Sequence, residues 1–124
     1  VDVTVHLAAN PSPQAEWGVL IPANVDMVLN VYEACTATGV SRLIFASSNH
    51  VMSGYRDTEI PVLRSDTQPN PGNPYGASKR IGERIGKSFS DCLEKSYLES
   101  VYRSGLTYML AVPCSERPDS LLGR

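Results

Sequence analysis

The sequence lacks the features that mark several large classes of protein. It has no excess of basic residues, because 11 lysines and arginines stand against 13 aspartates and glutamates and leave a formal net charge of -2. A nucleic-acid surface is normally strongly basic, so we expect no nucleic-acid partner. No apolar run approaches the ~20 residues that a membrane helix needs, so we expect no membrane partner.

Cysteine is also scarce, and its spacing does not suggest metal binding. Cys35, Cys92 and Cys114 form no C-x-x-C pair, and only His6 and His50 could join them as ligands. We therefore expect no metal site. An odd number of cysteines without a disulfide framework is typical of a reducing compartment, which favours a cytoplasmic protein with buried or bystander thiols.

The chain opens without an initiating methionine, directly on the apolar stretch VDVTVHLAAN. Its 124 residues, of which 42% are hydrophobic and 19% are charged, fit one globular domain and not two. We expect this domain to be a fragment of a longer protein.

Apolar patterning predicts strands that alternate with helices. Strands are expected over residues 3–8, 43–47 and 107–112, the first two buried on both faces of a sheet. Helices are expected over about 20–38 and 74–90. This alternation indicates crossover units, so we predict an α/β fold with a partial Rossmann-like, doubly wound parallel sheet.

Local signals mark where these elements begin and end. Gly39 is expected to cap the end of the first helix, and Asn73, followed by Pro74, the start of the second. Residues 49–73 are expected to form an irregular surface loop, and 90–104 a further polar helix. The apolar residues expected to share one face of the second helix are Ile81, Ile85 and Phe89.

Polar side chains follow the second strand where it ends, in FASSNH. Serine and asparagine are common where strands turn into loops, so Ser48 has an ordinary structural explanation. Parallel sheets, however, bind ligands at the carboxyl ends of their strands, and Ser48 lies at that edge. It could therefore bring a hydroxyl to a reacting centre.

Tyr75 and Lys79 are four residues apart in YGASK and therefore share one face of the second helix. A free tyrosine, with a pKa of about 10, is a poor base at neutral pH. A lysine ammonium one turn away and the positive end of the helix dipole both favour the phenolate. The pair could thus remove a proton from an alcohol, although the same spacing also occurs on ordinary solvated helices.

Three stretches together resemble the extended short-chain dehydrogenases/reductases of the NAD-dependent epimerase/dehydratase family. They are VDVTVHLAAN, ANVDMVLNVYEACTATGVSRLIFASS and NPYGASKRIGE, and they cover about the first ninety residues in order. The resemblance implies that Tyr75 is the catalytic acid/base. It implies that Lys79 assists Tyr75 and holds the nicotinamide ribose, and that Ser48 binds the reacting oxygen.

The resemblance also implies a cofactor site for NAD, with NADP not excluded. Asn24 matches an asparagine beside the nicotinamide half, but it could equally be a helix-start residue. The residues expected to line the cofactor are Leu7, Ala8 and Ala9.

The run Ser-Asn-His after the second strand resembles uronate dehydrogenases and related sugar dehydrogenases, which oxidise the anomeric carbon. This resemblance implies that Asn49 and His50 face a sugar substrate together with Ser48. Ser12 and Ser115 are further expected substrate contacts, although Ser115 could be an ordinary loop serine.

Two departures from the family pattern limit what this chain is expected to do alone. The Gly-rich G-x-x-G-x-x-G turn that binds the cofactor pyrophosphate does not occur in the sequence. The last strand also lacks the arginine that the family places there. We expect residues 1–112 to be the catalytic half of an NAD-binding domain and 113–124 to be a divergent or truncated tail.

The sequence therefore favours a fragment of an oxidoreductase that transfers hydride from the anomeric carbon of a sugar or sugar acid to NAD. The alternatives are a nucleotide-sugar epimerase or dehydratase with the same catalytic pair, and a non-catalytic binding or scaffold module. The 124-residue chain alone is expected to be inactive. A homo-oligomer formed through the two long helices is possible under each interpretation.

Overall fold

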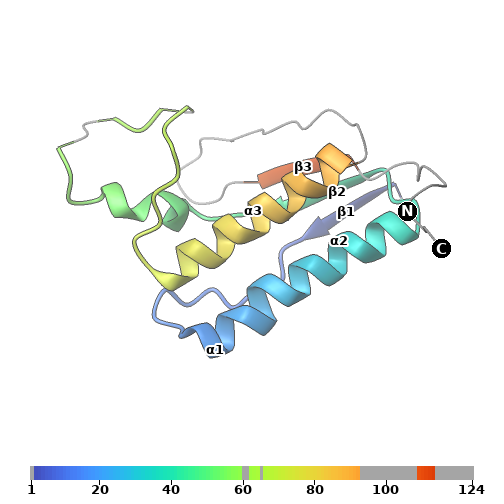
Figure 1. Cartoon of the computed structure of the whole chain (residues 1–124), viewed down its shortest axis with the longest axis horizontal. Helices are drawn as coiled ribbons and strands as arrows, with labels where there is room; N and C mark the ends of the chain where they lie inside the picture. The colour runs from blue at the N-terminus through green and yellow to red at the C-terminus, as the bar shows by residue number, and fades with distance from the viewer. Residues whose placement is uncertain (1, 60–61, 65, 93–108, 114–124) are drawn as a thin grey trace.

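The structure is a computed structural model that describes residues 2–59, 62–64, 66–92 and 109–113 (Figure 1). The elements, in chain order, are strand β1 (Val3–His6), helix α1 (Trp17–Leu20), π-helix η1 (Ile21–Asp26), helix α2 (Met27–Ala37), strand β2 (Arg42–Ala46), 3-10 helix η2 (Asn49–Tyr55), helix α3 (Pro74–Cys92) and strand β3 (Met109–Pro113).

The two long helices, α2 and α3, lie side by side across one face of the sheet (Figure 1). The hydrophobic core fills the space between these helices and β2. This arrangement confirms the predicted α/β fold class. The buried members of the core are Val28, Tyr32, Cys35, Val40, Leu43 and Phe45, with Val31, Ile85 and Phe89 packed against them.

Strands β1 and β2 pair in parallel, with Val3 opposite Arg42 and His6 opposite Phe45, as predicted. Strand β1 is shorter than expected, and burial on both of its faces is wrong. Val5 is 50% exposed, because the helices cover only the other face of this strand.

Strand β3 pairs with β2 in the antiparallel direction, with Met109 opposite Ala46 and Pro113 opposite Arg42. The expectation that the third strand continues a parallel sheet is therefore wrong. Helix α3 runs back towards the amino end of β2, and a parallel strand would have to start there. The sixteen residues between Cys92 and Met109 are enough chain to reach the carboxyl end of β2 instead.

The first predicted helix is present but begins earlier, at Trp17, and contains the π-helical turn η1. Pro22 has no N–H and cannot continue the ordinary helical ladder, and the N–H of Met27 reaches back five residues to the Pro22 carbonyl. The helix ends as predicted at Gly39, whose φ of 69° lies in the left-handed region. There the N–H of Val40 donates to the carbonyl of Cys35, as in a Schellman motif.

The start of α3 also confirms its prediction. The side-chain Oδ1 of Asn73 accepts a hydrogen bond from the N–H of Gly76 at 2.8 Å, and Pro74 is the first helical residue. Of the predicted apolar face, Ile85 and Phe89 join the core, whereas Ile81 is 36% exposed and lies at its edge.

The segment predicted as an irregular loop begins with an ordered turn of 3-10 helix, η2. The backbone of Gly54 and that of Val51 both bond to Asn70, which closes the rest of the segment back onto η2. The further helix expected over 90–104 lies outside the described residues, apart from the last turn of α3. Of the three cysteines, Cys35 is buried in the core as expected.

Within the described ranges, no helix has the combination of length and apolar character that crossing a membrane requires.

Candidate active site

The predicted catalytic residues come from two elements that meet at the carboxyl edge of β2. Strand β2 ends at Ala46, and the chain turns at Ser48 into η2. Helix α3 begins against η2 and carries Tyr75 and Lys79 in its first two turns. The site therefore depends on how tightly η2 packs against the start of α3.

Ser48 is the N-cap of η2, with its side-chain oxygen accepting a hydrogen bond from the N–H of His50 at 3.1 Å. The residue is buried and has an extended backbone, as expected for a cap. The Ser48 hydroxyl also donates a long hydrogen bond to the Oδ1 of Asn49 at 3.5 Å, and its second lone pair stays available. The ordinary structural role of Ser48 is thus real and still compatible with binding a substrate oxygen.

His50 connects Ser48 to Tyr75. Its ring meets the Tyr75 ring edge to face, with 5.4 Å between the ring centroids. Its backbone also lies directly on α3, because a Cβ at Gly76 would come within 2.7 Å of the carbonyl carbon of His50. Only glycine fits here, so η2 and the first turn of α3 are in close contact.

Lys79 lies one turn after Tyr75 and is only 3% exposed. Its Nζ donates a hydrogen bond to the carbonyl of Ala46 at 2.9 Å and lies 5.0 Å from the centroid of the Phe45 ring. Burial lowers the pKa of Lys79 to about 8, because removal from water disfavours the charged ammonium. The ammonium therefore remains the main form at neutral pH, held between α3 and the end of β2.

His6, at the end of β1, is a buried neighbour of Lys79. Its ring lies 6.0 Å from that of Phe45, and its Nε2 has no hydrogen-bond partner. Burial and the positive charge of Lys79 both lower the pKa of His6, so the imidazole is neutral. His6 therefore places no second positive charge beside the Lys79 ammonium.

Asn24 is 1% exposed and lies inside η1, so its interpretation as a helix-start residue is wrong. Its Oδ1 accepts from the N–H of Asn10 at 2.7 Å, and its Nδ2 donates to the Asn10 carbonyl at 3.1 Å and to the Ser78 hydroxyl at 3.0 Å. The Ser78 hydroxyl in turn donates to the carbonyl of Tyr75 at 2.7 Å. Asn24 thus ties the exit of β1 to the first turn of α3.

The remaining predicted residues are less closely tied to the site. Leu7 and Ala8 follow β1 and are exposed, and Asn49 is exposed beside Ser48. Ser12 takes part in a local turn, where its backbone N–H donates to Asn10 at 2.9 Å. Ala9 is half-buried in the same connection, and Ser115 lies outside the described residues.

Sequence reasoning missed a second set of polar contacts on the opposite face of the strand end. The Ser47 hydroxyl bonds to the Glu83 carboxylate, and Glu83 pairs with Arg80 at 2.8 Å. Successive side chains of an extended chain point to opposite faces, and this alternation could have separated Ser47 from Ser48. Ser47 therefore attaches the end of β2 to α3.

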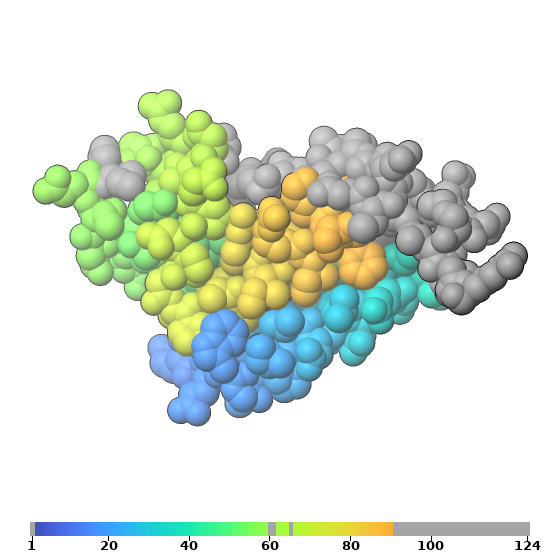
Figure 2. All heavy atoms as spheres, viewed as in Figure 1, coloured from blue at the N-terminus to red at the C-terminus, as the bar shows by residue number. Residues whose placement is uncertain are grey.

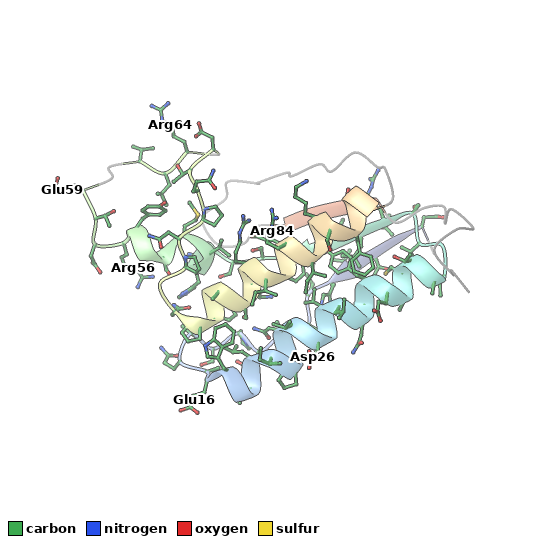
Figure 3. All side chains as sticks on the ribbon, viewed as in Figure 1. Glu16, Asp26, Arg56, Glu59, Arg64 and Arg84 are labelled. Carbon is green, nitrogen blue, oxygen red and sulfur yellow. The ribbon has the colours of Figure 1, made fainter. Side chains whose placement is uncertain are left out.

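Charge is distributed unevenly between the site and the surface. The labelled side chains in Figure 3 are all exposed, and they lie along the outside of the helices and of the 56–64 segment. Among the residues whose side chains the structure describes, Lys79 is the one lysine, arginine, aspartate or glutamate that is buried. A buried cation one turn from a tyrosine is an arrangement suited to stabilising a phenolate.

Comparisons with known proteins agree on the family to which this chain is similar. The model of the NAD dependent epimerase/dehydratase family matches residues 1–97. An L-arabinose 1-dehydrogenase (NAD(P)(+)) of Haloferax volcanii is 40% identical over 100 residues, which cover 73% of this chain and 39% of that protein. The chain thus spans well under half the length of this relative.

Solved structures of related proteins have the same fold. A structure described as a mutated uronate dehydrogenase matches with a TM-score of 0.67 and 32% identity, over 75% of this chain and 33% of that one. MoeE5, solved in complex with UDP-glucuronic acid and NAD, matches with a TM-score of 0.64 and 30% identity, over 73% of this chain and 30% of its own. With its family match over most of its length, its α/β fold and its Tyr75–Lys79 pair, this chain belongs to the NAD dependent epimerase/dehydratase family.

Proposed function

We propose that this chain carries the catalytic residues of an NAD-dependent dehydrogenase that oxidises the anomeric carbon of a sugar or sugar acid. The observation that carries the proposal is the placement of Tyr75 one turn before the buried ammonium of Lys79, with the ring of His50 packed against it. The two dehydrogenases among the relatives described above support the choice of substrate class.

The residues present fit the nicotinamide half of NAD. Leu7 and Ala8 are exposed, so the end of β1 is available for a flat ligand. Asn24 holds the segment after β1 against α3 through its hydrogen bonds to Asn10 and Ser78. Lys79 lies at the adjacent strand end, where it could reach a ribose hydroxyl. When bound, NAD would accept the hydride that leaves the sugar.

Proton transfer would fall to the residues of α3 and η2. Tyr75, as the phenolate, takes the proton from the hydroxyl on the anomeric carbon, and the neighbouring Lys79 ammonium stabilises the phenolate before the transfer. The Ser48 hydroxyl binds the same oxygen and orients it. The C–H bond of the anomeric carbon breaks as its C=O bond forms, so a cyclic sugar leaves as a lactone.

A nucleotide-sugar epimerase is the second candidate, because one neighbouring structure, MoeE5, contains UDP-glucuronic acid. In that reaction the same tyrosine moves the proton, but the hydride returns to the sugar. The difference is therefore whether reduced cofactor leaves the protein.

Two further properties belong to this proposal. We propose a cytoplasmic location, since Cys35 is a free, buried thiol and fits a reducing compartment. We also propose that α2 and α3 form a homodimer contact through their outward faces, where Leu29 and Ile81 are exposed.

The test uses the full-length protein that contains this chain, which is called the whole protein below. It is incubated with NAD and either free aldoses and uronic acids or UDP-sugars. We expect one reduced nicotinamide per free sugar consumed, together with a lactone. Inversion of the configuration at one carbon of a UDP-sugar, without accumulation of reduced cofactor, would show the epimerase function instead. No reaction with either set of substrates would contradict both candidate functions.

A further inference from the structure

The start of α3 contains a hydrogen bond that no catalytic role explains. The Nδ2 of Asn73 lies 2.8 Å from the Nδ1 of His50, across the contact between α3 and η2. Asn73 is also the N-cap of α3, where its Oδ1 accepts from the N–H of Gly76 at 2.8 Å. One short side chain therefore bonds to the helix and to the histidine at the same time.

The cap fixes which way the Asn73 amide faces. A backbone N–H can only donate, so the atom that meets Gly76 must be the carbonyl oxygen of the side chain. The atom that meets His50 is then the NH₂ group, which can also only donate. Nδ1 of His50 must accept this bond and cannot carry a hydrogen. In a neutral imidazole the hydrogen then belongs to Nε2.

The backbone around this pair is held equally firmly. The His50 carbonyl accepts a bond from the Ser53 hydroxyl at 2.8 Å, and the same hydroxyl accepts from the N–H of Gly72 at 2.9 Å. The N–H of His50 donates to Ser48 at 3.1 Å. The His50 ring is therefore fixed in position as well as in tautomer, and it meets the Tyr75 ring in an edge-to-face contact.

We propose that Asn73 is a positioning residue that holds His50 in the Nε2–H tautomer, so that His50 offers a single N–H donor to an oxygen of the sugar. The inference rests on the proposed function for the identity of the ligand, whereas the tautomer does not depend on it. Its consequence is a preference for substrates with an acceptor oxygen at that position. The pair Tyr75 and Lys79 carries the proton chemistry whichever tautomer is present.

Two substitutions separate the tautomer from the helix cap. Asparagine, aspartate and serine cap helices about equally well, so Asn73→Asp and Asn73→Ser both keep the bond to Gly76. The second oxygen of an aspartate can only accept, so Asn73→Asp forces the hydrogen onto Nδ1 of His50. Serine has no second group to reach His50, so Asn73→Ser removes the preference.

The test is ¹⁵N NMR of the histidine rings in the whole protein, recorded near pH 8, where an ordinary histidine with a pKa of about 6.5 is neutral. His50→Gln assigns the signals of His50. We expect a protonated Nε2 and a bare Nδ1 in the unmodified protein, the reverse in Asn73→Asp, and a mixture in Asn73→Ser. A protonated Nδ1 in the unmodified protein, or an unchanged tautomer in Asn73→Ser, would overturn the inference.

Kinetics then test whether the tautomer matters for the substrate. Loss of one hydrogen bond corresponds to roughly a threefold to tenfold weaker interaction. We expect KM for the sugar to rise by about this factor in Asn73→Ser and Asn73→Asp, with KM for NAD unchanged. An unchanged KM for the sugar in Asn73→Asp, with the tautomer reversed, would overturn the substrate part. Because the NMR result needs no turnover, failure of the proposed function would not be mistaken for failure of the tautomer assignment.

Discussion

The start and the end of α3 make different kinds of contact with the rest of the protein. The first two turns carry Tyr75, Ser78 and Lys79, which are buried and bond or pack to polar groups of β2, η1 and η2. The last turns carry Ile85 and Phe89, and the Phe89 ring stacks on Tyr32 of α2 with 5.4 Å between centroids. One continuous helix thus has a polar start at the sheet edge and an apolar end in the core.

The space-filling view shows which segments lie beside each part of α3 (Figure 2). The yellow start of α3 lies between the 49–73 segment and the beginning of the chain, and the orange part continues along α2. Substitutions at the two ends should therefore have separable effects. Removing the Tyr75 hydroxyl at the start should lower activity with little loss of stability, and removing the Phe89 ring at the end should do the reverse.

The largest effect is expected for Tyr75→Phe. Removing the proton acceptor should lower kcat of the whole protein by about 10²–10⁴-fold, the usual contribution of a general base. The ring and its contact with His50 remain, so the free energy of unfolding should stay within about 0.5 kcal/mol. Tyr55→Phe is the matched control, because it removes a hydroxyl that bonds the Gln68 carbonyl at the surface. Comparable loss of activity in both variants would remove the special role of Tyr75.

The core end of the helix is tested by Phe89→Ala. Loss of the ring stacked on Tyr32 should lower the free energy of unfolding by about 3 kcal/mol, measured by urea denaturation. Ile81→Ala, on the same helix but largely outside the core, should cost less than about 1 kcal/mol. Equal costs would mean that Phe89 is not a core anchor.

Two glycines of α3 lie against different parts of the molecule. A methyl group at Gly76 would collide with the backbone of His50, whereas one at Gly82 would come within 2.6 Å of the tip of the Phe45 ring. Gly76→Ala should lower stability by about 1–3 kcal/mol and also reduce kcat, because η2 must move away from Tyr75. Gly82→Ala should lower stability with a smaller change in kcat, since only a side chain must tilt. A larger kcat loss in Gly82→Ala would contradict the division.

Stability is also expected to depend on pH. Burial lowers the pKa of Lys79 to about 8, below the ordinary value of 10.5 that applies in the unfolded chain. Between these values the unfolded state binds more protons than the folded state, so stability rises with pH. The free energy of unfolding should therefore rise from about pH 8 to pH 10 relative to Lys79→Met. Parallel pH curves for the two proteins would show that Lys79 does not titrate as expected.

The sequence predicted the elements whose signals are local. Asn73 caps α3, Gly39 ends the first helix, and the Tyr75–Lys79 spacing places both on one helix face. Each of these depends on residues within one or two turns of one another. The prediction of Ser48 at the strand edge needed only the end of an apolar run.

The features that were missed depend on contacts distant in sequence. The antiparallel strand β3 pairs with β2, and Met109 lies opposite Ala46, more than sixty residues earlier in the chain. The bond from Asn24 to Ser78 spans 54 residues, and that from Asn73 to His50 spans 23. Side-chain pairs of this kind follow from packing, so a pattern read along the chain cannot find them.

We propose that the start of α3 removes a proton while hydride leaves the anomeric carbon of a sugar. The most direct measurement follows a sugar deuterated at that carbon through a single turnover of the whole protein with NAD, for the unmodified protein and for Tyr75→Phe. We expect the deuterium in the released reduced nicotinamide, with the transfer about 10²–10⁴-fold slower in Tyr75→Phe. Deuterium retained in the sugar product, or transfer at an equal rate in both proteins, would contradict the claim.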